Sequence, residues 1–204
     1  MTATAPRLKD IRLVADGWIK KYVLTYTMPD GSPYEYESAS RKNPKAYRQA
    51  LEANAAGQPT TADAVSIVPQ TPDGKLLLIR EFRYPLNSWC IAFPAGLMEP
   101  GESLAECVDR ELREETGYAL RTDLGAKAID PLPQAGFSST GLTDETVHVV
   151  FAQVEKVAAA QPEPAEFIEP FLLDIADVPR FLAENTVPLG TRVQLVLEAF
   201  ARRR

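Results

Sequence analysis

Three glutamates in the middle of the chain have a spacing that could hold a divalent metal ion. Glu111, Glu114 and Glu115 stand three and four residues apart, so on a helix they share one face. Carboxylate oxygens on a rigid helix suit Mg²⁺ or Mn²⁺. Arg110 lies one turn before Glu114, where it can pair with that carboxylate and orient it. The alternative is a solvated helix face, because helices rich in Glu and Arg are common.

The neighbouring residues predict a helix with defined ends. Ser103 followed by Glu106 is a capping box, which starts a helix at about Leu104. Gly117 lies where a glycine in the left-handed conformation ends a helix. The apolar residues between these ends recur with helical spacing and form a packing stripe, namely Leu104, Cys107, Val108 and Leu112. The glutamates therefore occupy a second face, and a glycine-containing loop, 96–101, precedes them.

The whole stretch from Gly96 to Tyr118 is more specific than any one carboxylate. It reads G-x5-E-x7-R-E-U-x-E-E-x-G-U, where U is aliphatic or aromatic. With average composition, such a match arises by chance in on the order of one in a million chains or fewer. The pattern is the Nudix box, and the chain resembles Nudix hydrolases. The resemblance implies hydrolysis of a nucleoside diphosphate linked to another group.

Residues outside the box resemble the ADP-ribose and ADP-sugar pyrophosphatase branch of that family. The stretches that carry this resemblance are Trp18, Tyr36–Lys42, Glu81–Arg83, Cys90–Leu97 and Gly141–Glu145. The branch implies metal-dependent hydrolysis of ADP-ribose or a related ADP-sugar to AMP and sugar phosphate. The alternatives are another nucleotide sugar, a dinucleoside polyphosphate or NADH, and a Nudix domain that senses a ligand without catalysis. The complete box disfavours the sensor.

The resemblance also assigns metal ligands and catalytic residues. The metal would be Mg²⁺, with Mn²⁺ able to substitute, held by the Ala95 carbonyl, Glu111, Glu114 and Glu115. Glu99 and Glu102 would assist through water or salt bridges, although Glu102 can instead pair with Arg110. Catalysis would use Arg110, Glu114 and Glu115 together with a general base on a loop.

The loop at 161–169 holds the candidates for that base. Glu166 matches the branch best, because Phe-Ile-Glu follows it, and Glu163 is held in reserve. The alternative is that this acidic, proline-rich loop is simply exposed to solvent.

Substrate-binding residues are implied at five further positions. In the branch, two aromatic rings stack on adenine, one from each subunit of a swapped dimer, and Trp18 and Tyr36 match them. Stacking contributes about 1–3 kcal/mol per base. Glu37 would accept from the adenine amino group, and Arg41 and Arg83 would clamp phosphate as planar donors. The alternatives are cross-strand packing of the two rings and surface positions for the arginines. Tyr36 departs from the tryptophan of the branch.

Composition excludes several other classes of protein. The 204 residues carry a net charge of −6, from 22 basic and 28 acidic side chains, which argues against a nucleic-acid or anionic-membrane surface. Cys90 and Cys107 lie in apolar runs, so buried free thiols are expected. His148, the one histidine, lies in an alternating run and is expected in a strand. A Ser-His-Asp or Cys-His site would have to use it.

No apolar run reaches the roughly 18 residues of a membrane helix, and residues 1–9 lack the apolar core of a signal peptide. We therefore expect a cytoplasmic protein with a small-molecule nucleotide substrate, a homodimeric state and no nucleic-acid or membrane partner.

The chain is expected to form an N-terminal part, residues 1–58, and a Nudix hydrolase domain, residues 59–204. The first part holds a hairpin of strands at 22–27 and 34–37 and a short helix followed by a linker within 43–61. A hairpin cannot bury a core alone, so we expect it to pack on the main domain or on a second subunit. Dimerisation is its expected role.

The second part alternates strands with helices. Strands are predicted at 64–68, 75–79, 89–93, 147–154 and 168–174. Besides the box helix, Asp177 is predicted to cap a short helix that ends at Glu184, and Thr191 with Gln194 is predicted to open a final helix as a capping box. A mixed sheet with helices on both faces gives an α/β/α sandwich, to which a small N-terminal antiparallel β unit is added.

Overall fold

The computed structural model of the chain describes residues 4–59 and 61–202. Their contacts divide the chain into two units. One unit comprises the residues up to Asp63 together with Ala135–Val147, and the other comprises Ala64–Gln134 and the residues from His148 onward. Each unit is described by itself.

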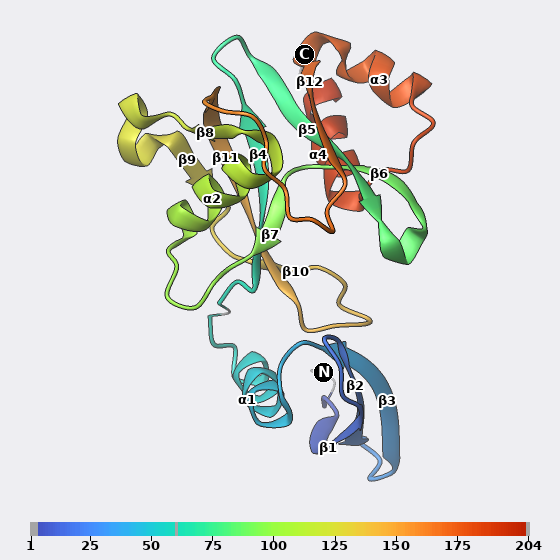
Figure 1. Cartoon of the computed structure of the whole chain (residues 1–204). Helices are drawn as coiled ribbons and strands as arrows, with labels where there is room; N and C mark the ends of the chain where they lie inside the picture. The colour runs from blue at the N-terminus through green and yellow to red at the C-terminus, as the bar shows by residue number, and fades with distance from the viewer. Residues whose placement is uncertain (1–3, 60, 203–204) are drawn as a thin grey trace. The chain divides into compact units, whose positions relative to one another are not determined.

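The first unit contains a three-stranded antiparallel sheet, in the order β1-β2-β3, and one helix (Figure 1). The elements are β1 (Arg7–Ala15), β2 (Lys20–Thr27), β3 (Pro33–Ser40) and α1 (Pro44–Ala55). The predicted hairpin is confirmed, with Leu24 opposite Tyr36 and Tyr26 opposite Tyr34. A further short strand, β10 (Gly136–Phe137), pairs with the first residues of β11 (Thr146–Lys156).

This unit has a small core of its own, which the sequence did not lead us to expect. Tyr22 of β2 and Tyr47 of α1 are 0% and 1% exposed, and their rings lie 4.8 Å apart. The Tyr47 and Ser38 hydroxyls are hydrogen-bonded at 2.6 Å. Within this unit, β1 and α1 provide apolar surface that a two-stranded hairpin lacks, and the expected packing of the hairpin on the main domain or on a second subunit stays a prediction.

The second unit is built on a large sheet. Its central order is β11-β4-β5-β12, with β6 paired to β5, β7 to β4, and both β8 and β9 to β11. The strand bounds are β4 (Ala64–Gln70), β5 (Lys75–Arg83), β6 (Ser88–Ala92), β7 (Ala95–Leu97), β8 (Tyr118–Leu120), β9 (Ile129–Pro131) and β12 (Ile168–Asp174). All five strands predicted for this part of the chain are confirmed.

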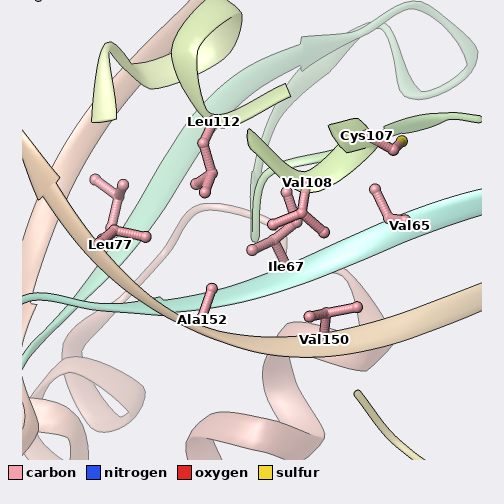
Figure 2. Packing of buried hydrophobic residues seen from close by; sticks show 9 residues of the cluster. Val65, Ile67, Leu77, Cys107, Val108, Leu112, Val150 and Ala152 are labelled. Atoms are coloured by element: carbon pink, nitrogen blue, oxygen red, sulfur yellow. The ribbon is translucent and has the colours of Figure 1, made fainter. Parts of the chain in front are cut away.

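Helices cover both faces of the sheet. Along β5, Leu77 belongs to the core under α2 (Leu104–Thr116), whereas its neighbours Leu76 and Leu78 belong to the core under α3 (Val178–Glu184) and α4 (Thr191–Arg202). Successive side chains of a strand point to opposite faces, so the two cores lie on opposite sides of the sheet (Figure 1). Figure 2 shows the α2 side, where Val108 and Leu112 meet β4, β5 and β11. The α/β/α sandwich is confirmed.

Short 3₁₀ segments complete the unit, namely η1 (Tyr84–Leu86), η2 (Thr122–Ala128) and η3 (Ile175–Asp177).

Both cysteines are buried and form no disulfide, as predicted. His148 lies in β11, with its Nε2 2.7 Å from the Leu132 carbonyl oxygen. Within the described parts of the chain, no helix is long and apolar enough to cross a membrane.

Two of the predicted helix caps were wrong. Asp177 occupies the N-cap position of α3 but makes no capping hydrogen bond, because its carboxylate pairs with Arg180 at 3.0 Å. Thr191 is the first residue of α4 rather than its cap. The Gln194 N–H donates to the Gly190 carbonyl at 3.0 Å, so the helix begins one residue before the position that the capping-box pattern indicated.

The core under α2 makes a testable prediction about stability. Leu112 is 0% exposed, and Leu112→Ala should lower the free energy of unfolding by about 2–5 kcal/mol, because it removes buried methyl groups and leaves a cavity. Leu195 also lies in a helix but is 66% exposed, so it is the matched control. Leu195→Ala should change the free energy of unfolding by about 0.5 kcal/mol or less. Urea unfolding measures both, and equal losses for the two variants would contradict the packing described.

Candidate active site

The box helix α2 has the ends that the sequence predicted. The Ser103 hydroxyl accepts from the Glu106 N–H at 3.3 Å, and the Glu106 carboxylate accepts from the Ser103 N–H at 2.9 Å. Gly117 has φ 70°, in the left-handed region, and its N–H donates to the Arg113 carbonyl. The apolar stripe that includes Val108 packs on the sheet. This packing fixes the glutamates on another face of the helix.

Arg110 connects that face to the loop before the helix. Its guanidinium donates to Glu102 at 2.8 Å, to Glu111 at 2.7 Å and to Glu114 at 3.1 Å. A further N–H donates to the Leu97 carbonyl at 3.0 Å. One arginine therefore orients three carboxylates, and the predicted pair with Glu114 is confirmed.

Glu102 is committed to this network. Hydrogen bonds from Arg110 lower the pKa of its carboxyl to about 2, and its second oxygen also accepts from the Glu99 N–H at 2.9 Å. Both oxygens thus have donors within the protein. The pairing of Glu102 with Arg110, which the sequence left as an alternative to an assisting role, is what the structure shows.

Glu111 and Glu115 are buried against the backbone of the preceding loop. They are 9% and 4% exposed. The Ala95 N–H donates to the Glu115 carboxylate at 3.1 Å. At Gly96 a side chain would have its Cβ only 1.8 Å from Glu111 Oε1, so glycine is required for this close approach. The loop and the two carboxylates therefore form one compact arrangement.

The charged forms of these two carboxyl groups are disfavoured. Burial raises the pKa of Glu115 well above its ordinary value, and the nearby charges of Glu111 and Glu81 raise it further. Burial also raises the pKa of Glu111, although Arg110 acts in the opposite direction. A bound cation would relieve both the loss of hydration and the repulsion.

The residues present fit a divalent cation in their chemistry. Glu111, Glu115 and the backbone of Ala95 gather hard oxygen atoms, which Mg²⁺ and Mn²⁺ prefer. Across residues 4–59 and 61–202, no three His, Cys, Asp or Glu side chains form a ready metal cluster. Glu114 has a side chain that is 46% exposed and is held by Arg110.

Glu81 is a site residue whose position the sequence analysis missed. Its side chain is 14% exposed and accepts from Arg83 at 2.6 Å. Burial raises the pKa of the Glu81 carboxyl, with Arg83 opposing and Glu166 adding to the rise. Leu77 packs under α2, and the side chain four residues further along the strand points to the same face, so the place of Glu81 follows from a tertiary contact that no local sequence pattern indicated.

The predicted base, Glu166, lies within electrostatic reach of this group. Its charge contributes to the raised pKa values of Glu81, Glu111 and Glu115. The Glu166 carboxylate accepts from the Glu163 N–H at 3.0 Å, and its own N–H donates to the Glu163 carbonyl at 2.9 Å. Glu169, by contrast, pairs with Arg80 at 2.8 Å.

The two predicted stacking rings, Trp18 and Tyr36, belong to the first unit. Trp18 lies between β1 and β2 and is 75% exposed, which does not fit cross-strand packing. Tyr36 donates its hydroxyl to the Gly141 carbonyl at 2.6 Å. It lines a pocket of about 500 Å³ that Trp18 does not line. Within one chain, the two rings therefore do not both line this pocket.

The polar residues predicted to bind substrate are all paired with protein groups. Glu37 accepts from Lys21 at 2.8 Å, and Arg41 is hydrogen-bonded to Glu145. In the second unit, Arg83 holds Glu81. Each residue would have to exchange or share its partner to bind a ligand.

Comparison with known proteins identifies the family. Residues 60–190 match the model of the NUDIX domain. The chain belongs to the Nudix hydrolase family. The site described above is thus built on a complete Nudix box, from Gly96 to Tyr118.

Relatives of this Nudix protein match over most of its length. The chain is 30% identical over 198 residues to an ADP-sugar pyrophosphatase of Mus musculus, covering 92% of the chain and 80% of the relative. It is 31% identical over 188 residues to an ADP-ribose pyrophosphatase of Saccharomyces cerevisiae, covering 89% and 76%. The crystal structure of an ADP compounds hydrolase superposes with a TM-score of 0.73 at 21% identity, covering 99% of this chain and 95% of that one, and shows a shared fold.

The site predicts that Glu102 and Glu115 affect stability with opposite signs. The pKa of Glu102 is lowered to about 2, so its ionised form stabilises the fold above its ordinary pKa of about 4.3, and this contribution is lost as the pH falls toward the lowered value. The pKa of Glu115 is raised, so its ionised form destabilises the fold at neutral pH. With EDTA at about pH 7.5, Glu102→Gln should lower the melting temperature and Glu115→Gln should raise it.

Repeating the measurement at lower pH provides the control. The stabilisation by Glu115→Gln should begin to shrink as the pH falls below the raised pKa and should vanish only near the ordinary pKa of about 4.3, where Glu115 is protonated in the unfolded chain as well. The loss in Glu102→Gln should persist to about pH 4. A Glu115→Gln protein less stable than wild type at every pH would contradict the electrostatics described.

Proposed function

We propose that this Nudix hydrolase cleaves the pyrophosphate bond of ADP-ribose or a related ADP-sugar, giving AMP and sugar phosphate. The observation that carries the proposal is the pair of buried carboxylates, Glu111 and Glu115, held against Ala95 and Gly96. The names of the relatives from mouse and yeast support the substrate class.

A divalent cation, Mg²⁺ with Mn²⁺ able to substitute, would be held by Glu111, Glu115 and the Ala95 carbonyl. Glu114 would assist from the end of the Arg110 network. When bound, such an ion stabilises the charge on the pyrophosphate as a Lewis acid. Arg110 keeps Glu111 and Glu114 oriented throughout.

The remaining chemistry falls to residues of the loop and of β5. A water molecule attacks one phosphorus, the phosphoanhydride P–O bond breaks, and Glu166 accepts the proton of that water. For this step the Glu166 carboxylate would leave the Glu163 N–H that now occupies it. Arg83 would exchange Glu81 for a phosphate oxygen, and Arg41 would exchange Glu145.

Recognition of the base would use Trp18, Tyr36 and Glu37. Trp18 does not line the pocket that contains Tyr36, which supports an arrangement in which the base stacks between one ring from each of two chains. We therefore propose a homodimer in which the first unit contributes to dimerisation. The cytoplasmic location expected from the sequence stays a prediction.

Substrate hydrolysis tests the proposed function directly. Purified protein with Mg²⁺ or Mn²⁺ should release AMP and ribose 5-phosphate from ADP-ribose, and EDTA should abolish this release. The same assay should include other nucleotide sugars, a dinucleoside polyphosphate and NADH. Rapid cleavage of one of these with no cleavage of ADP-sugars would replace the proposed substrate class.

Substitutions of single carboxylates test the proposed roles. Glu111→Gln and Glu115→Gln should each lower kcat by orders of magnitude, because the cation loses a charged oxygen ligand. Glu166→Gln should lower kcat by about 10²–10⁴-fold without weakening the binding of Mg²⁺, because only the proton acceptor is removed.

Glu155→Gln, at an exposed position of β11, is the matched control and should leave kcat unchanged. Circular dichroism verifies that each variant is folded. Near-normal rates in both Glu111→Gln and Glu115→Gln would show that the metal assignment is wrong, and a normal rate in Glu166→Gln would transfer the role of base to Glu163 or Glu169.

A further inference from the structure

The segment between β11 and β12 is attached to the active site at both ends. At one end the Gln161 N–H donates to the Glu114 carbonyl of α2 at 2.8 Å. At the other end the Phe82 N–H of β5 donates to the Phe167 carbonyl at 3.0 Å. Glu166 lies immediately before the second attachment point. The loop is thus tied to the helix that carries Glu115 and to the strand that carries Glu81.

Tyr84 adds a side-chain attachment next to Glu166. Its hydroxyl donates to the Ala165 carbonyl at 3.0 Å, one residue before the proposed base. Tyr84 itself is 62% exposed, so its position is not set by burial in the core. The hydrogen bond therefore depends on what supports the ring.

The Tyr84 ring is supported by an aromatic group on β5 and β6. It packs edge-on against Phe82, with ring centroids 5.5 Å apart and planes at 85°. Phe82 packs in the same way against Trp89, at 6.1 Å and 82°, and the Arg80 guanidinium lies 4.3 Å from the centre of the Trp89 ring. Edge-to-face and cation–π contacts of this kind restrict ring orientation. The hydroxyl is thus presented from a defined point on the sheet.

A shift at Ala165 would be passed on to Glu166. The two residues share a peptide unit, and Glu166 is also folded back on Glu163 through two hydrogen bonds. The short turn 163–166 is therefore held together by its own hydrogen bonds. Catalytic groups must be placed closely, and a misplacement of about 1 Å can cost about 10²-fold in rate.

We infer that Tyr84 is a positioning residue for the proton acceptor, and that its hydroxyl fixes the Ala165 carbonyl and so sets where the Glu166 carboxylate lies. The inference rests on the proposed function, in which Glu166 accepts the proton of the attacking water. Tyr84 itself touches neither substrate nor the reacting atoms in this role. It acts through the loop alone.

Tyr84→Phe is the sharpest test, because it keeps the ring and its contact with Phe82 but removes the hydroxyl. With ADP-ribose and Mg²⁺, we expect kcat to fall by about 3–10-fold, the effect of one exposed hydrogen bond of about 1 kcal/mol, while KM and the melting temperature stay unchanged. Glu155→Gln, at an exposed position of β11, is the control for kcat and should leave it unchanged. Tyr34→Phe, at a similarly exposed tyrosine of the first unit (51%), is the matched control for hydrogen exchange.

A double-mutant comparison separates positioning of Glu166 from a general effect on structure. In a Glu166→Gln background, Tyr84→Phe should have no further effect on kcat, because the group that it positions is already inactive. An unchanged kcat in the single variant, or an equal loss in both backgrounds, would overturn the inference.

Hydrogen exchange measures the loop without using the reaction. Amides in residues 161–167 should exchange several-fold faster in Tyr84→Phe than in wild type or Tyr34→Phe, with no change in α2. Unchanged exchange would overturn the inference even if the proposed function holds. Faster exchange together with a normal rate in Glu166→Gln would instead refute the proposed base, and with it the catalytic part of the inference.

Discussion

The structure depends on one unfavourable arrangement, the burial of two like charges side by side. Glu111 and Glu115 lose most of their hydration and repel each other, so their ionised forms destabilise the isolated fold. Arg110 compensates part of this cost at Glu111, but it does not contact Glu115. In the proposed function a divalent cation joins the two carboxylates and offsets this cost.

The rest of the fold keeps these carboxylates in place. The apolar stripe of α2 packs on β4, β5 and β11 (Figure 2), and the capping box at Ser103 fixes where the helix begins. Gly96 lets the loop backbone approach Glu111. Because the loop that carries Glu166 is bonded to both α2 and β5, helix, strand and loop hold their carboxylates on one common frame.

Most of the fold, and the part of the site that α2 carries, could be predicted from the sequence because their signals are local. The ends of α2, its apolar stripe and the pair of Arg110 with Glu114 all follow from residues within one or two helical turns. The place of Glu81 depends on which face of β5 meets α2, and the pairing of Arg41 with Glu145 joins residues far apart in the chain, so no local pattern indicated either. The caps at Asp177 and Thr191 failed because a competing partner, Arg180 or the Gly190 carbonyl, takes part in the turn.

Binding of Mg²⁺ to the protein without substrate tests the central claim most directly. Isothermal titration calorimetry over a range of pH should show saturable binding to the wild-type protein, accompanied by proton release at the pH values where the raised pKa keeps Glu115 protonated. Binding should be unchanged in Glu155→Gln and strongly weakened in Glu115→Gln. Equal affinity in wild type and Glu115→Gln, with no proton release in either, would contradict the assignment of these buried carboxylates to a cation.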